Sequence, residues 1–217
     1  MPRDKRYDIL FEPLQIGPVT AKNRFYQVPH CTGMGYLRPR MLAEMRGVKA
    51  EGGWGVVCTE YNSIHPSSDD LTHASASLWD DSDIRAHTLM TDKVHAHGAL
   101  AGAELWYGGA RTGNMMTREI ALDLSSMPNT AGHPFQTRAM DKTDIRNLRR
   151  WHRKAALRAR DAGFDIVYVY ATHTYLLSNF LNPKINTRSD EYGGSLENRV
   201  RLVRELIEET KDAVGDR

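Results

Sequence analysis

Short β-type runs alternate with longer helix-type runs along this chain, and no other feature of the sequence limits the possible fold as strongly. Such alternation is typical of a parallel sheet whose strands are connected by helices. Strands are predicted at residues 24–28, 54–59, 99–106 and 165–170. Helices are predicted at residues 41–51, 83–97 and 196–214, with another between a Thr143 cap and Gly163.

The expected fold class is therefore α/β, as the N-terminal half of a (β/α)8 TIM barrel that stops after its fourth unit. A closed barrel needs eight strands and about 250 residues, whereas this sequence has 217 residues and ends where a fifth strand is due. Residues 1–217 are expected to form one partial barrel domain. The alternative is a complete four-stranded α/β sandwich, although four strands alone leave two bare parallel edges.

Composition narrows the classes of partner. The 29 basic and 27 acidic residues are well mixed and give a formal charge of +2, which offers no reason to expect a nucleic-acid or membrane surface. The apolar stretches are far shorter than the roughly 20 residues of a bilayer span, and the N-terminus lacks an apolar signal core. A cytoplasmic enzyme with a small-molecule substrate is the default expectation.

Cysteine usage excludes some kinds of site from this segment. Cys31 and Cys58 are the only two cysteines, too few for a disulfide framework or for a zinc or iron–sulfur centre. No metal site is expected here. Cys58 falls inside a predicted strand and is expected to be buried packing.

Reactive side chains concentrate just past the predicted strands, where the catalytic groups of parallel barrels gather. The candidates are Pro29, His30 and Cys31 after the first strand, Glu60 and Tyr61 after the second, Glu104, Trp106 and Tyr107 near the end of the third, and Tyr170, His173 and Tyr175 after the fourth. This grouping predicts one site at the carboxyl ends of the strands.

These residue types point to chemistry on a cationic amine. Tyr170, His173 and Tyr175 form a trio that can bind, donate and relay protons. Glu104 is a carboxylate in an otherwise small and apolar strand, where it must be paired, solvated or used. The rings of Tyr61, Trp106 and Tyr107 offer faces that attract alkylammonium groups by about 0.5–2 kcal/mol each. Taken singly, these three aromatic residues are each equally compatible with a core or lid role.

A long motif carries a resemblance to a known family. Asn182-Pro183 and the run from Asn186 to Arg199, which reads NTRSDEYGGSLENR, resemble the signature segment of the old yellow enzyme family of FMN-dependent barrels. Within it the chain is most similar to the trimethylamine and dimethylamine dehydrogenase branch, through residues 7–11, 23–31, 49–54, 104–109 and 161–170. Residues 111–136 show no such match.

The resemblance implies roles for the candidate residues. Cys31 corresponds to a cysteine bonded to carbon 6 of FMN, Pro29 and His30 line the ring, and Glu104 lies near its polar edge. Tyr61 corresponds to an aromatic wall of the trialkylamine pocket and is expected to contact both cofactor and substrate. Tyr170, His173 and Tyr175 correspond to the active-site trio that binds substrate and tunes ionisation.

The implied reaction is oxidative N-demethylation of a small methylated amine. A C–H bond next to nitrogen breaks, FMN is reduced, and the resulting iminium hydrolyses to formaldehyde and a smaller amine. The resemblance also implies a [4Fe–4S] cluster and a second nucleotide in a missing C-terminal part, a flavoprotein or similar carrier as electron acceptor, and a homo-oligomer at full length. The 217-residue chain alone is expected to be inactive and to hold FMN weakly.

Three alternatives stay open. The first is demethylation of N-methylated amino acids such as dimethylglycine or N-methylproline, which would need a basic residue near the flavin; Arg111 is the candidate. The second is an NAD(P)H-dependent ene-reductase of the same family. The third is a non-catalytic half-barrel that pairs with another half-barrel.

Overall fold

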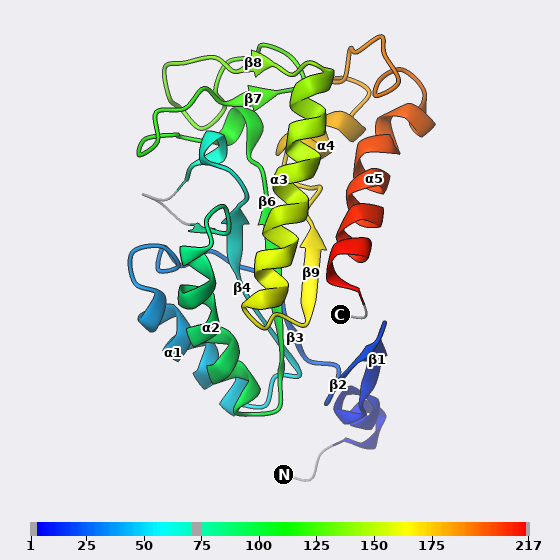
Figure 1. Ribbon diagram of the computed structural model, residues 1–217. Helices are drawn as coiled ribbons and strands as arrows, with labels where there is room; N and C mark the ends of the chain where they lie inside the picture. Colours follow the sequence, from blue (N-terminus) through cyan, green and yellow to red (C-terminus); the bar gives the residue numbers. More distant parts are fainter. Residues whose placement is uncertain (1–3, 71–74, 216–217) are drawn as a thin grey trace.

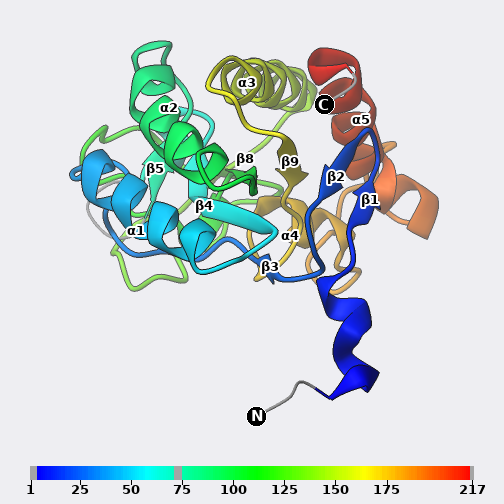
Figure 2. The ribbon, with the colours of Figure 1, turned by 90° about the horizontal axis from the view of Figure 1, so that it is seen from below.

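The computed structural model describes residues 4–70 and 75–215 and contains a parallel sheet whose strands follow chain order. Its strands, in the order β3-β4-β6-β9, are β3 (Tyr26–Gln27), β4 (Val56–Ser63), β6 (Leu100–Trp106) and β9 (Ile166–Val169), with β5 (Ala76–Ser77) pairing only with the end of β4. The connecting helices are α1 (Pro39–Glu51), α2 (Ser82–His95), α3 (Lys142–Asp161) and α5 (Leu196–Val214). Seen from below, these helices follow one side of the curved sheet (Figure 2). This arrangement confirms the predicted half of a (β/α)8 barrel.

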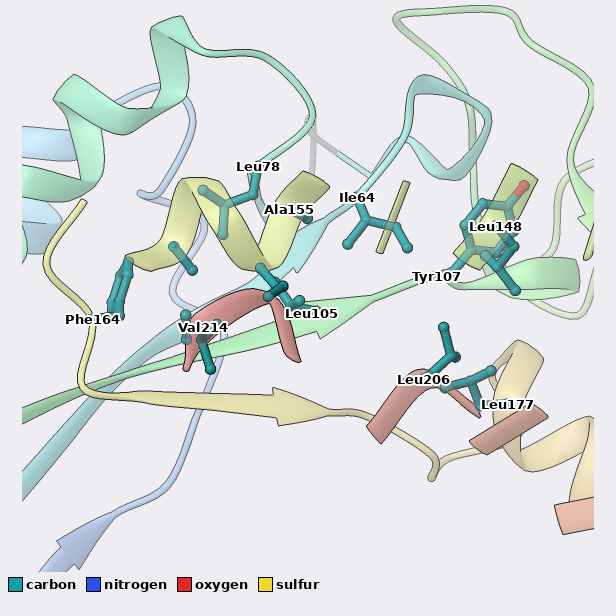
Figure 3. Packing of buried hydrophobic residues seen from close by; sticks show 14 of the residues in the cluster. Ile64, Leu78, Leu105, Tyr107, Leu148, Ala155, Phe164, Leu177, Leu206 and Val214 are labelled. Atoms are coloured by element: carbon teal, nitrogen blue, oxygen red, sulfur yellow. The ribbon is translucent and has the colours of Figure 1, made fainter. Parts of the chain in front are cut away.

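Alternate side chains of each barrel strand point outward and pack against the helices. In β6 the outward residues Ala101, Ala103 and Leu105 are buried in the main core, which Figure 3 shows from close by. The small alanines leave room for α3, whose buried positions include Ala155 and Ala159. The apolar stripe predicted for this helix is therefore the face that packs on the sheet.

The opposite face of the sheet forms the inner surface of the half-barrel. Val56 and Cys58 of β4 pack there with Ala21 in a second, smaller apolar cluster. Ala21 ends an antiparallel hairpin, β1 (Leu14–Ile16) and β2 (Val19–Ala21), that lies at the amino ends of the barrel strands (Figure 1). Cys58 is fully buried, as its place in a strand predicted.

The carboxyl ends of the strands carry the irregular part of the fold. Between β6 and α3 the chain forms a 3₁₀ turn at Gly109–Arg111 and a small parallel sheet of β7 (Leu122–Asp123) and β8 (Arg138–Ala139). A short helix, α4 (Leu176–Leu181), follows β9. Figure 1 shows these pieces gathered at one end of the barrel strands. Further 3₁₀ turns lie at Lys5–Phe11 and Pro66–Ser68.

Several predicted boundaries are corrected by the structure. β4 continues to Ser63, so Glu60 and Tyr61 belong to the strand and do not follow it. α3 is capped by Asp141, which exchanges hydrogen bonds with Asp144 in a capping box, and Thr143 lies inside the helix. The last helix begins after Ser195, as predicted. Within the described ranges, no helix is long and apolar enough to cross a membrane.

Candidate active site

A cavity of about 210 Å³ opens at the carboxyl ends of the barrel strands. Its walls consist of eight predicted site residues: Pro29, His30, Cys31, Tyr61, Glu104, Tyr170, His173 and Tyr175. They come from four different strand ends, up to 146 residues apart in the chain, and the parallel order of the strands brings them together. The structure therefore assembles the predicted cofactor and catalytic residues in one place.

The other two predicted residues, Trp106 and Tyr107, do not line this cavity. Trp106 is buried behind it, with its ring 4.4 Å from that of Tyr61 and 5.2 Å from that of Tyr175. Tyr107 is the next residue along, so strand alternation turns it to the outer core beside α3, as Figure 3 shows. Its hydroxyl hydrogen-bonds to Ser67 over 2.7 Å. Direct substrate contact, predicted for both, is not supported for either.

Two buried charged residues fix the backbone on each side of Cys31. The Arg46 guanidinium donates to the carbonyl oxygen of His30 over 2.7 Å. The Glu60 carboxylate accepts from the backbone N–H of Thr32 over 2.6 Å and from that of Gly35 over 3.0 Å. Both charged side chains are fully buried. The thiol of Cys31 is thus carried by a segment whose backbone is anchored at both neighbours, although the cysteine itself is exposed.

A bulge in β4 makes this arrangement possible. Cys58 pairs with Gly102 and Tyr61 with Glu104, so three steps on β4 match two on β6. The extra residue lets Tyr61 face the cavity opposite Glu104 while Glu60 turns to the loop after β3. Gly35 suits this contact, because a Cβ there would lie 2.5 Å from a Glu60 carboxylate oxygen.

The sequence pointed to Glu60 only as one of the side chains near the end of a strand, and it did not point to Arg46. Arg46 occupies a buried position on the inner side of α1, where an apolar residue is the usual choice. A charged residue in the middle of an apolar helix face could have indicated a buried, hydrogen-bonded arginine at this position. Burial lowers the pKa of the Arg46 guanidinium, and the neighbouring Glu60 carboxylate opposes that shift.

The strand-four trio is held in a strained loop. The Tyr170 hydroxyl and the His173 Nδ1 are 2.5 Å apart. His173 and Thr174 both have positive φ angles, 55° and 58°, which non-glycine residues adopt rarely. Tyr175 is the N-cap residue of α4, and its ring centroid lies 5.6 Å from that of Tyr170. Burial raises the pKa of both tyrosine hydroxyls, and the Glu104 carboxyl adds to the shift at Tyr170. Each phenol is therefore neutral near pH 7.

Aromatic rings form one wall of the cavity. Tyr61 and Tyr175 have ring centroids 6.3 Å apart, with Trp106 packed against both. The Tyr61 hydroxyl donates to the Asp70 carboxylate over 2.5 Å. Burial, reinforced by that carboxylate, raises the pKa of the Tyr61 hydroxyl, so this ring keeps its proton.

The cavity also changes the acid–base chemistry of Glu104 and Cys31. Glu104 is 7% exposed and hydrogen-bonds through its carboxyl to no other residue that the structure describes. Burial raises its pKa to about 7. Although Cys31 is exposed as a residue, partial desolvation of its thiol in the cavity wall raises the pKa to about 12, and the Glu60 and Glu104 carboxylates contribute to that shift. Near pH 7 the Cys31 thiol is therefore neutral and the Glu104 carboxyl is about half protonated, and both groups face a common space.

A residue missed from the sequence, Asp123, joins the loop after β6 to the helix after β9. Its carboxylate accepts from the backbone N–H of Ala110 over 2.8 Å and from the Asn179 side chain over 3.2 Å. Asp123 is fully buried. Burial raises its pKa to about 6. No periodicity marks this residue, since it lies in the loop that matched nothing.

The fold and the site together define the N-terminal half of a (β/α)8 barrel. Its parallel strands follow chain order, its helices lie outside, and its reactive side chains gather at the carboxyl ends of the strands. Residues 9–217 match the NADH:flavin oxidoreductase / NADH oxidase family, and the chain belongs to that family. This membership confirms the family resemblance read from the sequence.

Among individual proteins, the chain is 46% identical over 223 residues to a dimethylamine dehydrogenase of Hyphomicrobium sp. (strain x), covering 100% of this chain and 30% of that protein. The structure resembles histamine dehydrogenase from Rhizobium sp. 4-9, with a TM-score of 0.94, 50% identity, and coverage of 99% of this chain and 33% of that one. It also resembles 6-hydroxypseudooxynicotine amine oxidase from Pseudomonas geniculata N1, with a TM-score of 0.95, 49% identity, and coverage of 99% and 32%. The chain thus spans about a third of the length of these relatives.

Proposed function

We propose that this chain forms the N-terminal half of the barrel of an FMN-dependent enzyme that oxidises a small methylated amine. The observation that carries the proposal is the 210 Å³ cavity, in which a buried carboxyl with no partner among the described residues, a free thiol, a tyrosine–histidine pair and aromatic rings face one space. Similarity to a dimethylamine dehydrogenase and to two enzymes named for other amines supports an amine as substrate.

The cavity residues fit a flavin. The Glu104 carboxyl is buried without a partner among the described residues and can hydrogen-bond to the polar edge of a ring. Pro29 and His30 supply a wall, and Tyr61 an aromatic face beside it. Cys31 presents a free thiol, which we propose is the point of covalent attachment. When bound, the flavin would supply the two-electron acceptor that no protein side chain here provides.

The protein residues would bind the amine and manage its proton. The rings of Tyr61 and Tyr175 suit a methylated ammonium group, which has few hydrogen-bond donors and is attracted to aromatic faces. Oxidation needs the neutral amine, so a base must take the ammonium proton. The His173 ring, hydrogen-bonded to the Tyr170 hydroxyl, is the group placed to do so.

The simplest substrates of this kind are trimethylamine and dimethylamine, and the reaction is oxidative N-demethylation. The experiment that tests it uses the full-length protein with an artificial electron acceptor. Methylated amines should give acceptor reduction with one equivalent of formaldehyde. Oxidation of NADPH with an enone, without amine turnover, would instead support the ene-reductase alternative. A protein that binds no flavin and only self-associates would support the non-catalytic half-barrel.

The remaining proposals concern the whole protein. A cytoplasmic location, a flavoprotein-type electron acceptor, a homo-oligomer, and a [4Fe–4S] cluster with a second nucleotide outside this chain rest on the family resemblance. Cys31 and Cys58 are the only cysteines in this sequence, so the ligands of such a cluster would belong to another part of the protein.

A further inference from the structure

A groove rich in arginine lies on the outer surface of the half-barrel. Helices α3 and α5 run side by side there (Figures 1 and 2). The cavity between them has a volume of about 310 Å³, and it is called the arginine groove below. Its lining residues are Arg146, Arg149, Arg150, Arg153 and Glu209. None of them lines the cavity of the candidate active site, so amine oxidation does not account for this groove.

One of the four arginines is paired and has a structural role. The Arg149 guanidinium contacts the Glu209 carboxylate of α5 and lies 3.3 Å from a carboxylate oxygen of Glu205. Buried Thr210 of α5 also hydrogen-bonds to His152 of α3 over 3.1 Å. These contacts join the two helices and fix the walls of the groove. They also neutralise Glu209, which is the acidic residue of the lining.

The other three arginines carry a charge that no carboxylate balances. Arg146 donates to the Thr143 hydroxyl over 2.8 Å. Arg150 and Arg153 form no side-chain hydrogen bond or ion pair with any residue that the structure describes. All three side chains are exposed. Because each guanidinium has five N–H donors, most of the donors around the groove are open to a ligand.

The spacing of these arginines is unfavourable for the helix that carries them. Residues three or four positions apart are neighbours on a helix, and like charges at those intervals destabilise it. The four arginines of the groove are all related by these intervals. Packing on the sheet does not require them, since it uses the opposite, apolar face of α3 with Leu148 and Ala155. A bound anion would offset the repulsion.

The chemistry of the groove favours phosphate groups. A guanidinium binds a phosphate through two parallel N–H donors. From Arg146 to Arg153 the helix rises about 10 Å, which is longer than a single phosphate group. Two linked phosphates can therefore contact arginines from both turns at once.

We propose that the arginine groove binds a soluble ligand that carries two or more linked phosphate groups. The site is separate from the proposed amine oxidation and does not depend on it. A concave site between two helices suits a small molecule. A membrane surface fits less well, because the apolar face of α3 packs on the sheet and is not free to enter a bilayer.

The test measures the binding of inorganic pyrophosphate to the full-length flavin-loaded protein by isothermal titration calorimetry. The parent should bind pyrophosphate at least tenfold more tightly than sulfate, which offers a single anionic group. Arg150→Gln combined with Arg153→Gln removes two unpaired charges and should weaken pyrophosphate binding at least tenfold. Binding to the parent should also weaken as salt is added, because the arginines are exposed to solvent.

A matched variant separates the groove from net charge. Arg40→Gln combined with Arg85→Gln removes the same charge from exposed positions on α1 and α2 and should leave pyrophosphate binding unchanged. A nucleotide site in another part of the full-length protein keeps its residues in both variants, so the difference between them isolates the groove. Without pyrophosphate, the Arg150→Gln/Arg153→Gln protein should unfold at the temperature of the parent or higher, since like-charge repulsion is relieved.

Four results would overturn the proposal. The first is a parent protein that does not bind pyrophosphate, as expected if another part of the protein or an acidic partner covers the groove. The second is equal weakening by the two pairs of substitutions, which would indicate attraction to net charge alone. The third is binding to phosphatidylglycerol vesicles without binding to pyrophosphate, which would assign the groove to a membrane surface. The fourth is a lower unfolding temperature of ligand-free Arg150→Gln/Arg153→Gln, which would assign these arginines to the fold.

Discussion

The Glu60 carboxylate and the backbone N–H of Thr32 lie 2.6 Å apart, and this contact fixes the residue next to Cys31. Glu60 also receives the Gly35 N–H, so one buried side chain closes the loop after β3. On the other side Arg46 holds the His30 carbonyl. The reactive thiol is thus positioned by residues that do not themselves line the cavity.

Replacing Glu60 should therefore loosen the Cys31 segment. Glu60→Gln puts an amide that can donate where two acceptors are needed, and it leaves a buried N–H without a partner, at a cost of about 1–3 kcal/mol. Thermal unfolding of the full-length protein should occur several degrees lower, and the fraction of flavin attached to Cys31 should fall. Glu51→Gln, at an exposed position at the end of α1, is the control and should change neither the unfolding temperature nor the fraction of attached flavin. Unchanged unfolding and attachment in Glu60→Gln would rule out the anchoring role.

The Tyr170–His173 contact predicts a kinetic effect. Tyr170→Phe keeps the ring and removes the hydroxyl 2.5 Å from Nδ1, so kcat for amine oxidation should fall at least tenfold, since positioned acid–base groups contribute about 10²–10⁴-fold. The pH dependence of kcat should shift as well. Tyr107→Phe is the matched control, because its hydroxyl bonds to Ser67 away from the cavity. Equal effects of the two changes would contradict the assigned geometry.

The raised pKa of Cys31 predicts slow alkylation of the free thiol. Burial and the nearby Glu60 and Glu104 carboxylates raise that pKa to about 12, and only the thiolate reacts. In full-length protein prepared without flavin, iodoacetamide should modify Cys31 at pH 8 at least about a hundredfold more slowly than free cysteine. The rate should rise about tenfold per pH unit up to pH 10. Peptide mapping separates Cys31 from buried Cys58. An alkylation rate that levels off between pH 9 and pH 10 would show an ordinary thiol pKa of about 8.5 and contradict the raised value.

Asp123 predicts a coupling between two loops. Asp123→Ala removes the carboxylate oxygen that accepts from both the Ala110 N–H and the Asn179 side chain, so both contacts are lost together. Hydrogen exchange should speed up together in residues 107–112 and 176–181, with a loss of about 1–3 kcal/mol in stability. Asp92→Ala, at an exposed position on α2, is the control. Faster exchange in only one of the two segments would mean that Asp123 does not join them.

The sequence was sufficient to predict the barrel rhythm because each strand–helix unit has its own periodicity. The stripe on α3 and the Ser195 cap of α5 are local signals, and both were read correctly. The eight cavity residues were found by one geometric rule, that parallel strands end on the same side. Local sequence patterns and the topology of the barrel were therefore sufficient to predict these helices and cavity residues.

What was missed depends on contacts between distant residues. The extent of β4 was underestimated because its second half, Thr59 to Ser63, is mostly polar yet buried. The bulge that separates Glu60 from Tyr61 has no sequence signature here. α4 has six residues, too few to show a helical period. Trp106 and Tyr107 were both predicted at the site because they are aromatic residues near a strand end, a rule that does not distinguish the two faces of the strand.

The measurement that tests the central claim most directly is anaerobic mixing of the full-length flavin-loaded protein with substrate. A methylated amine should bleach the flavin absorbance within the time of turnover, and the Tyr170→Phe variant should bleach at least tenfold more slowly. NADPH at the same concentration should leave the flavin oxidised. Bleaching by NADPH with no response to any amine would contradict the assignment of this cavity to amine oxidation.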